Sequence, residues 1–194
     1  MPESLVRSGN ILRPLFSAIK IKTIDAHAIE QRRAWPENHH SLFIWDIHDE
    51  TIAVEEKHAD GSFKCREIYT PGQSVCAAVY EHDTLYGLCA MMLTADTLET
   101  HYMDTQPGDH SLRGRFTLIA AHIALCIAQD RNLNSLRIID PLNTKLASLH
   151  TRFGYVFTSP PTLSADGQYP CMVVSTKKLE QYCATERNKD FNPL

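Results

Sequence analysis

Residues 143–157, NTKLASLHTRFGYVF, have the pattern of an amphipathic helix that ends at a glycine and leads into a strand. The apolar side chains of the helix, one of them just upstream, recur at three- and four-residue spacing: Leu142, Leu146, Leu149 and Phe153. Such a stripe is expected to face a core. Gly154 is placed to end the helix, because glycine adopts the left-handed conformation of a helix C-terminus without strain. Asp140 and Pro141 are typical of an N-cap and a first helical residue.

Strands are expected on both sides of this helix. LRIID, residues 136–140, is a short apolar run that predicts a buried strand before it. YVFTS at 155–159 and YPCMVVSTKKL at 169–179 predict two strands after it, joined as a long hairpin. The polar tail at 183–194 is expected to be frayed.

Three further strands, a loop and a long helix are predicted upstream. The strands span residues 74–82, 84–93 and 97–104, and the second is apolar at nearly every position, so both its faces should be covered. A polar loop at 106–115 then leads to a helix that begins near Phe116.

The strand at residues 97–104, TLETHYMD, alternates strictly, which predicts two distinct faces. One face should carry Leu98, Thr100 and Tyr102, and the other should carry Glu99, His101 and Met103. Two ionisable side chains, Glu99 and His101, should therefore lie next to each other on one face of the sheet.

The first 70 residues are less regular. IKIKTI at 19–24 alternates as a strand does, and DAHAIEQRRAW at 25–35 predicts a short helix with Asp25 as its N-cap. Residues 40–69 indicate strands around turns, of which Asp60-Gly61 is the clearest.

From about residue 74 to 179, this succession of elements resembles the GCN5-related N-acetyltransferase fold. In the helix-and-turn segment, Asn143 matches the family's asparagine, and His150, seven residues later, takes the place usually held by a tyrosine. Phe153-Gly154-Tyr155 resembles the closing glycine and aromatic residue. The resemblance implies an α/β fold whose central sheet is mixed, mostly antiparallel and flanked by helices.

The same resemblance implies one acetyltransferase-like domain over residues 1–194. Its N-terminal part, residues 1–70, is divergent, and residues 74–179 form the core that resembles the family. The expected activity is direct transfer of an acetyl group from acetyl-CoA to an amine. The alternative is a non-catalytic binding or regulatory module that keeps the fold but has lost CoA binding.

The expected cofactor site is the loop before the long helix, where the family's backbone N–H groups hold the CoA pyrophosphate. A helix N-terminus favours anions through its unpaired amides and its dipole. Gly114 is retained from the family pattern, but Phe116 stands where a second small residue belongs. Arg113 and Arg115 could compensate through charged contacts with phosphate.

The resemblance also implies roles for other residues. Tyr102 and Met103 would give backbone contacts to the pantetheine arm of acetyl-CoA, and Asn143 would belong to the cofactor site. His150 would donate a proton to the leaving thiolate as an imidazolium, and Glu99 or His101 would accept the proton of the amine. Purely structural roles for His150, Glu99 and His101 stay open.

Composition excludes several other classes. The net charge of −4, with acids and bases scattered, argues against a nucleic-acid-binding module. Neither a signal peptide nor a transmembrane stretch is visible, which predicts a cytoplasmic protein that does not bind membranes. The six cysteines lack ligand spacing and are expected to be reduced, and the ten histidines show no metal-binding spacing. The expected partner is a small-molecule or protein amine, with a homodimer as a possibility.

Overall fold

The computed structural model describes residues 2–16, 18–36, 41–58, 62–108, 112, 114–139, 144–158, 160, 162–163 and 170–187. Several features expected from the sequence lie outside the described residues: the turn at Asp60-Gly61, the N-cap at Asp140-Pro141, and the cofactor residues Arg113 and Asn143.

A seven-stranded sheet forms the centre of the fold, in the order β1-β5-β6-β7-β8-β10-β9. Among its described neighbours, β7 and β8 pair in parallel and the other five pairs are antiparallel. The expected mixed, mostly antiparallel sheet is therefore confirmed. The strands are β1 Ile19–Thr23, β5 Ser74–Glu81, β6 Thr84–Leu93, β7 Thr97–Thr105, β8 Ser135–Ile139, β9 Val156–Phe157 and β10 Cys171–Ser175.

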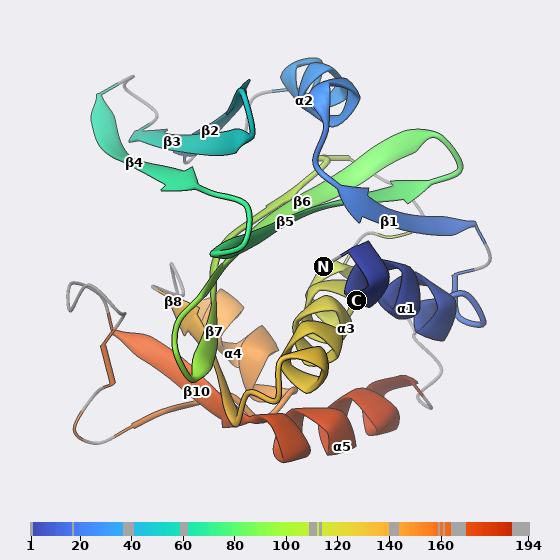
Figure 1. The fold of residues 1–194 in the computed structure, drawn as a ribbon, viewed down its shortest axis with the longest axis vertical. Helices are drawn as coiled ribbons and strands as arrows, with labels where there is room; N and C mark the ends of the chain where they lie inside the picture. Colours follow the sequence, from blue (N-terminus) through green and yellow to red (C-terminus); the bar gives the residue numbers. More distant parts are fainter. Residues whose placement is uncertain are drawn as a thin grey trace.

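Each face of this sheet is covered (Figure 1). One face carries a smaller antiparallel sheet and a helix: β2 Ser41–His48, β3 Thr51–His58, β4 Phe63–Tyr69 and α2 Ala26–Arg33. The other face carries four helices: α1 Pro2–Leu12, α3 Phe116–Asp130, α4 Thr144–Thr151 and α5 Thr176–Arg187. Asp25 caps α2 as expected, because its carboxylate accepts a hydrogen bond from the Ala28 N–H.

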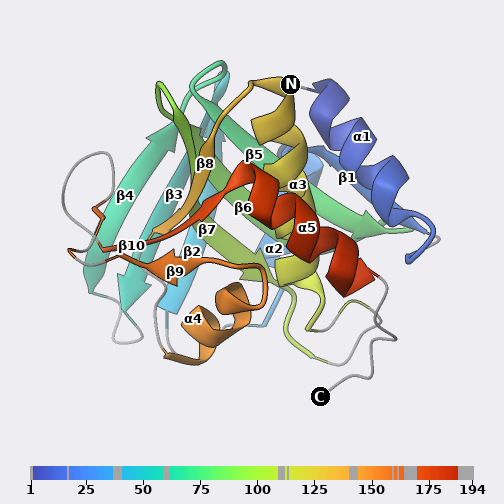
Figure 2. The ribbon, with the colours of Figure 1, turned by 90° about the horizontal axis from the view of Figure 1, so that it is seen from below.

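Two apolar clusters hold these layers together. The cluster on the helix side joins α1, α3 and α5 to the sheet, and the cluster on the other side fills the space between the two sheets. Helix α3 lies between α1 and α5 (Figure 2), and 12 of its 15 residues are buried. This explains why its sequence is apolar nearly all round rather than on one stripe.

The C-terminal segment differs from expectation. Residues 176–187 were expected to continue a strand and then fray, but they form α5, with Leu179 and Cys183 fully buried. The strand stops at Ser175, whose hydroxyl accepts a hydrogen bond from the Lys178 N–H at the start of the helix. Leu179 and Cys183 are four residues apart, so they lie on the same helix face and pack on the core.

The cysteines of the described core are free thiols. Cys76, Cys89, Cys126, Cys171 and Cys183 are all buried and unbridged. Burial raises the pKa of the Cys89 thiol to about 12, so that thiol is protonated at neutral pH. These five residues pack as small apolar side chains, as the sequence predicted; the side chain of Cys65 is outside the described part.

Candidate functional site

The candidate site is organised by a β-bulge in β7. Thr100 pairs with Met91 and Tyr102 pairs with Ala90, so His101 is an extra residue with no partner in the register. A bulge of this kind interrupts the alternation of side chains along a strand.

Because of the bulge, the predicted alternation of side chains along β7 is wrong after Thr100. Thr100 and Met103, which strict alternation places on opposite faces, both point to the helix side, where they line one pocket. Tyr102 belongs instead to the cluster between the two sheets, on the same side as His101 and Glu99. The prediction that Glu99 and His101 share a face is confirmed.

A small pocket, here called the β7–β8 pocket, opens where these two strands separate. Their parallel pairing covers Thr97–Thr100 of β7, although β7 continues to Thr105. The pocket is bounded by β7, β8, α3, α4 and the residues after α4. Its lining residues are Thr100, Met103, Thr117, Ala120, Ala121, Ala124, Ile138, His150, Phe153 and Tyr155.

His150 lines this pocket but is not the imidazolium expected from the sequence. Its side chain is buried, and its ring stands edge-on to Tyr155 with centroids 6.0 Å apart. Burial lowers the pKa of His150 to about 4. The ring is therefore neutral at pH 7, because only about one molecule in a thousand would carry the extra proton.

The buried neutral His150 should make the protein sensitive to acid. Its folded pKa of about 4 lies below the unfolded value of about 6.5, so the unfolded state binds the proton more tightly. Stability should fall as the pH drops below 6.5, by about 2 kcal/mol at pH 5 and about 3 kcal/mol at pH 4. Urea unfolding from pH 7 to pH 4 measures this loss.

A matched pair of variants isolates the His150 contribution to acid sensitivity. In His150→Leu, the free energy of unfolding should fall less between pH 6.5 and pH 4, here called the acid limb, because the group that titrates has been removed. His27→Leu, which removes an exposed histidine from α2, should leave the acid limb in place. Parallel acid limbs for the parent and His150→Leu would contradict the assignment.

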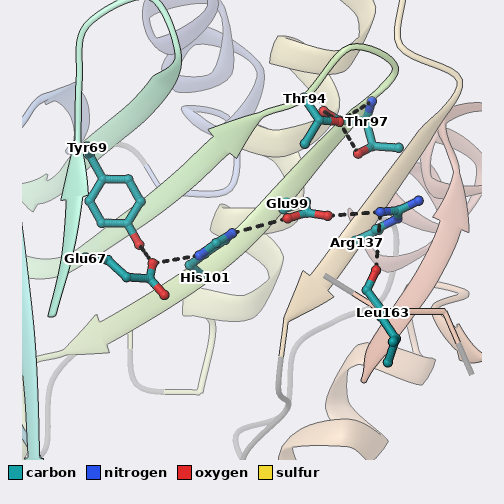
Figure 3. A network of polar contacts seen from close by, with 8 residues as sticks. All are labelled: Glu67, Tyr69, Thr94, Thr97, Glu99, His101, Arg137 and Leu163. Atoms are coloured by element: carbon teal, nitrogen blue, oxygen red, sulfur yellow. Dashed lines mark hydrogen bonds and ion pairs between the residues drawn. The ribbon is translucent and has the colours of Figure 1, made fainter. Parts of the chain in front are cut away.

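Four ionisable side chains form a row on the opposite face of β7, here called the charged row (Figure 3). Glu67 from β4 approaches His101 from β7, with 2.7 Å between Oε2 and Nδ1. His101 Nε2 lies 3.4 Å from Glu99 Oε2, and Arg137 from β8 donates a 3.0 Å hydrogen bond to Glu99 Oε1. Tyr69 donates its hydroxyl to Glu67 Oε2. The row therefore connects the small sheet to both parallel strands of the large sheet.

The charged row keeps His101 protonated at pH 7. Burial alone would lower the pKa of His101, but its contacts with Glu67 and Glu99 outweigh burial and raise the pKa to about 9. Glu99 is fully buried, whereas the side chain of Glu67 is 28% exposed. Glu67 is thus the carboxylate of the row that solvent reaches.

A second polar cluster lies further along β7. Arg32 from α2 forms an ion pair with Asp104, at 2.5 Å between Nε and Oδ2, and also donates to the Phe43 carbonyl of β2. The Trp45 indole N–H donates to the same Asp104 oxygen at 3.1 Å. Burial raises the pKa of Asp104 and outweighs the opposing effect of Arg32. These contacts connect α2 and β2 of the small sheet to β7 of the large sheet.

The loop before α3 retains a conformation that favours glycine. Gly114 has a φ of +71°, and a Cβ added there would meet no atom of the described residues within 4 Å. Phe116 turns inward: its ring packs on the bare backbone of Gly87 in β6, where an added Cβ would lie 2.0 Å from it. Phe116 therefore fills the core beneath the loop. The guanidinium of Arg115 lies over the Phe16 ring, 5.4 Å from its centroid.

Sequence reasoning missed several residues of the site. Glu67, Tyr69 and Arg137 join the charged row, and Thr100 and Tyr155 line the β7–β8 pocket. Arg137 lies opposite Glu99 because of the parallel register of β7 and β8, and no local pattern in the sequence fixes that register.

In the described part of the chain, no helix has both the length and the apolar character needed to cross a membrane. Within the same residues, no group of three or more His, Cys, Asp or Glu side chains is arranged to hold a metal ion.

Comparison with known proteins places the fold. No family model matches the chain, and no curated protein matches its sequence. Among solved structures, nourseothricin acetyltransferase is similar over 82% of this chain and 99% of its own, with a TM-score of 0.50 and 16% identity. The ribosomal-protein-S18-alanine N-acetyltransferase from Escherichia coli is similar over 81% and 92%, with a TM-score of 0.47 and 9% identity. The first of these similarities confirms the acetyltransferase-type fold expected from the sequence.

Proposed function

We propose that this chain, which has the fold of the GCN5-related N-acetyltransferases, transfers an acetyl group from acetyl-CoA to an amine. The observation that carries the proposal is the arrangement at the bulge of β7. A pocket between β7 and β8 lies on one face, and an ionisable row lies at the same level on the other. A thioester held between the strands would be open to an amine that arrives from the charged row.

The donor would be held by backbone and by charge. Tyr102 and Met103 follow the bulge, where β7 has left β8, and their backbone groups would contact the pantetheine arm. The N-terminus of α3 would receive the pyrophosphate, because the first amides of a helix have no intrahelical acceptor and the side chain of the N-cap residue Arg115 makes no capping bond. Arg113, Gly114 and Asn143 would complete this cofactor site.

The transfer needs one proton acceptor and help for the leaving sulfur. The amine nitrogen attacks the thioester carbonyl carbon, the C–N bond forms, the C–S bond breaks, and CoA leaves as the thiolate. The proton of the amine would pass to His101, which is a strong enough base once it has lost its own proton. Glu99, fully buried between His101 and Arg137, would support that ring. His150 would donate a hydrogen bond to the sulfur as a neutral imidazole.

Calorimetric titration with acetyl-CoA tests the donor site. Arg115→Ala removes one charged contact, which is worth roughly 1.5–3 kcal/mol when the partner is an anion. Acetyl-CoA should therefore bind about 10- to 100-fold more weakly. Arg131→Ala, at the opposite and exposed end of α3, removes the same charge away from the proposed site and should leave the affinity unchanged. Equal affinities for the parent and Arg115→Ala would place the phosphates elsewhere.

The competing function is a non-catalytic module with the same fold. Two departures from the family pattern favour it: Phe116 in the phosphate loop and His150 in place of the tyrosine. The same titration separates the two functions. Heat of acetyl-CoA binding, followed by release of free CoA thiol when a panel of amines is added, supports the transferase. No binding of acetyl-CoA by the folded protein would favour the module.

A further inference from the structure

The charged row reaches outside the large sheet. Glu67 belongs to β4 of the small sheet, 34 residues before His101, and its carboxylate lies 2.7 Å from the His101 ring. Its position is fixed from two sides: Tyr69, buried and also on β4, donates to the same carboxylate oxygen, and the rings of Tyr69 and His101 are edge-to-face at 6.1 Å. The small sheet therefore contributes directly to the environment of the proposed base.

The two nitrogens of His101 have unequal contacts. Nδ1 makes a short hydrogen bond with Glu67. Nε2 is buried, lies 3.4 Å from Glu99 and makes no aligned hydrogen bond with any residue that the structure describes. A hydrogen bond to one ring nitrogen fixes the proton there and decides which nitrogen loses its proton first. In this geometry the proton on Nδ1 is held, and the proton on Nε2 is the one released.

We propose that Glu67 is a positioning residue that holds the proton of His101 on Nδ1, so that Nε2 is the atom that accepts the proton of the amine. This inference rests on the proposed function. The step is balanced: the amine loses one proton, Nε2 gains it, and the imidazolium later returns it to solvent or to the CoA thiolate. The ring is only partly exposed and Nε2 is buried against Glu99, so the proton of the amine would reach Nε2 through a water molecule rather than directly.

The other groups that face His101 set the background for a pH measurement. On β7 these are Glu99 and Tyr102, on β4 they are Glu67 and Tyr69, and on β8 Arg137 acts through Glu99. Burial raises the pKa of Tyr69 far above its ordinary value, so its hydroxyl stays protonated throughout the range studied. Arg137 and Glu99 belong to the large sheet and are kept in every variant of the small sheet. A change in the pKa of His101 can therefore be assigned to the substituted residue.

The first measurement follows the His101 ring by ¹⁵N NMR in the parent protein from pH 6 to pH 10.5. We expect one titration near pH 9 and, above it, a neutral ring with its proton on Nδ1. A neutral ring with its proton on Nε2 would overturn the proposal without any variant being needed.

The second measurement compares two substitutions that each remove one negative charge from the small sheet. Glu67→Gln should lower the pKa of His101 by about one to two units, because the opposite charge that favours the imidazolium is lost. The rise of kcat/KM with pH, which should level off near the pKa of His101, should move to lower pH by the same amount. Glu55→Gln is the matched control: its side chain is also 28% exposed but pairs with Lys57 and Arg66, and it should move neither value.

The outcomes separate this inference from the proposed function. An unchanged His101 titration in Glu67→Gln, or an equal shift in Glu55→Gln, overturns the role of Glu67 whether or not the protein transfers acetyl groups. A shifted titration with an unshifted rate profile removes His101 from proton transfer. A shifted titration in a protein that neither binds acetyl-CoA nor releases CoA overturns the proposed function and leaves the contact of Glu67 with His101 in place.

Discussion

Replacing His101 by glutamine is expected to lower kcat for acetyl transfer by about 10²–10⁴-fold, the usual contribution of a positioned acid or base. Glutamine retains an amide N–H that can donate to Glu67, but it has no atom that accepts a proton near neutral pH. The loss should appear in kcat rather than in acetyl-CoA affinity, because His101 lies on the opposite face of β7 from the β7–β8 pocket.

The pH dependence of the parent enzyme provides a second test of His101. With a pKa of about 9, His101 is the free base in about one molecule in a hundred at pH 7, so kcat/KM should rise tenfold per pH unit and level off near pH 9. The ionisation of an alkylamine acceptor would give a similar rise. Repeating the profile with an acceptor of much lower pKa, such as hydroxylamine, removes that contribution, and a limb that stays near pH 9 belongs to the protein.

A matched histidine variant and a stability measurement complete this test. His48→Ala removes an exposed histidine from the small sheet and should leave kcat unchanged. The thermal midpoint of His101→Gln must be compared with that of the parent, because the substitution removes the cation that lies between Glu67 and Glu99. A folded His101→Gln variant with the parent's kcat would show that another group or water removes the proton.

Elements with a strong local pattern could be predicted from the sequence. The long apolar run of α3, the glycine after α4 and the Asp25 cap of α2 are each set by residues close in the chain. The end of β10 was missed because residues 171–179 contain no glycine or proline to mark the end of a strand. The strand ends where Ser175 caps α5 and the pair Leu179 and Cys183 of that helix packs on the core.

The candidate site was only partly predictable, since its geometry depends on tertiary features. An extra residue at the bulge of β7 exchanges the faces of Tyr102 and Met103, and alternation alone does not reveal it. The contact of Glu67 with His101 requires the small sheet to fold over the large one. His150 was placed on the correct helix, but its burial, and therefore its neutral charge, depends on packing against distant strands.

The largest loss of stability is expected at the cluster that fastens the small sheet in place. Asp104 is 2% exposed and Arg32 is 12% exposed, so neither charge has much solvent to stabilise it alone. Asp104→Asn would leave the Arg32 guanidinium without its counter-ion and should lower the free energy of unfolding by roughly 3–5 kcal/mol, as breaking a buried ion pair from one side usually does. Urea unfolding at pH 7 measures this change.

The double substitution Arg32→Met with Asp104→Leu should cost less than Asp104→Asn alone. It removes both charges and their desolvation penalty, which is large here because burial raises the pKa of Asp104 despite the adjacent guanidinium. The exposed pair one residue along the same helix, Arg33 with Asp46, is the control, and Asp46→Asn should change stability by less than about 1 kcal/mol. If the double variant were less stable than Asp104→Asn, the pair would stabilise the fold through its charges. If the double variant is the more stable of the two, as expected, the main role of the Arg32–Asp104 pair is to orient the small sheet, and with it Glu67, over the bulge of β7.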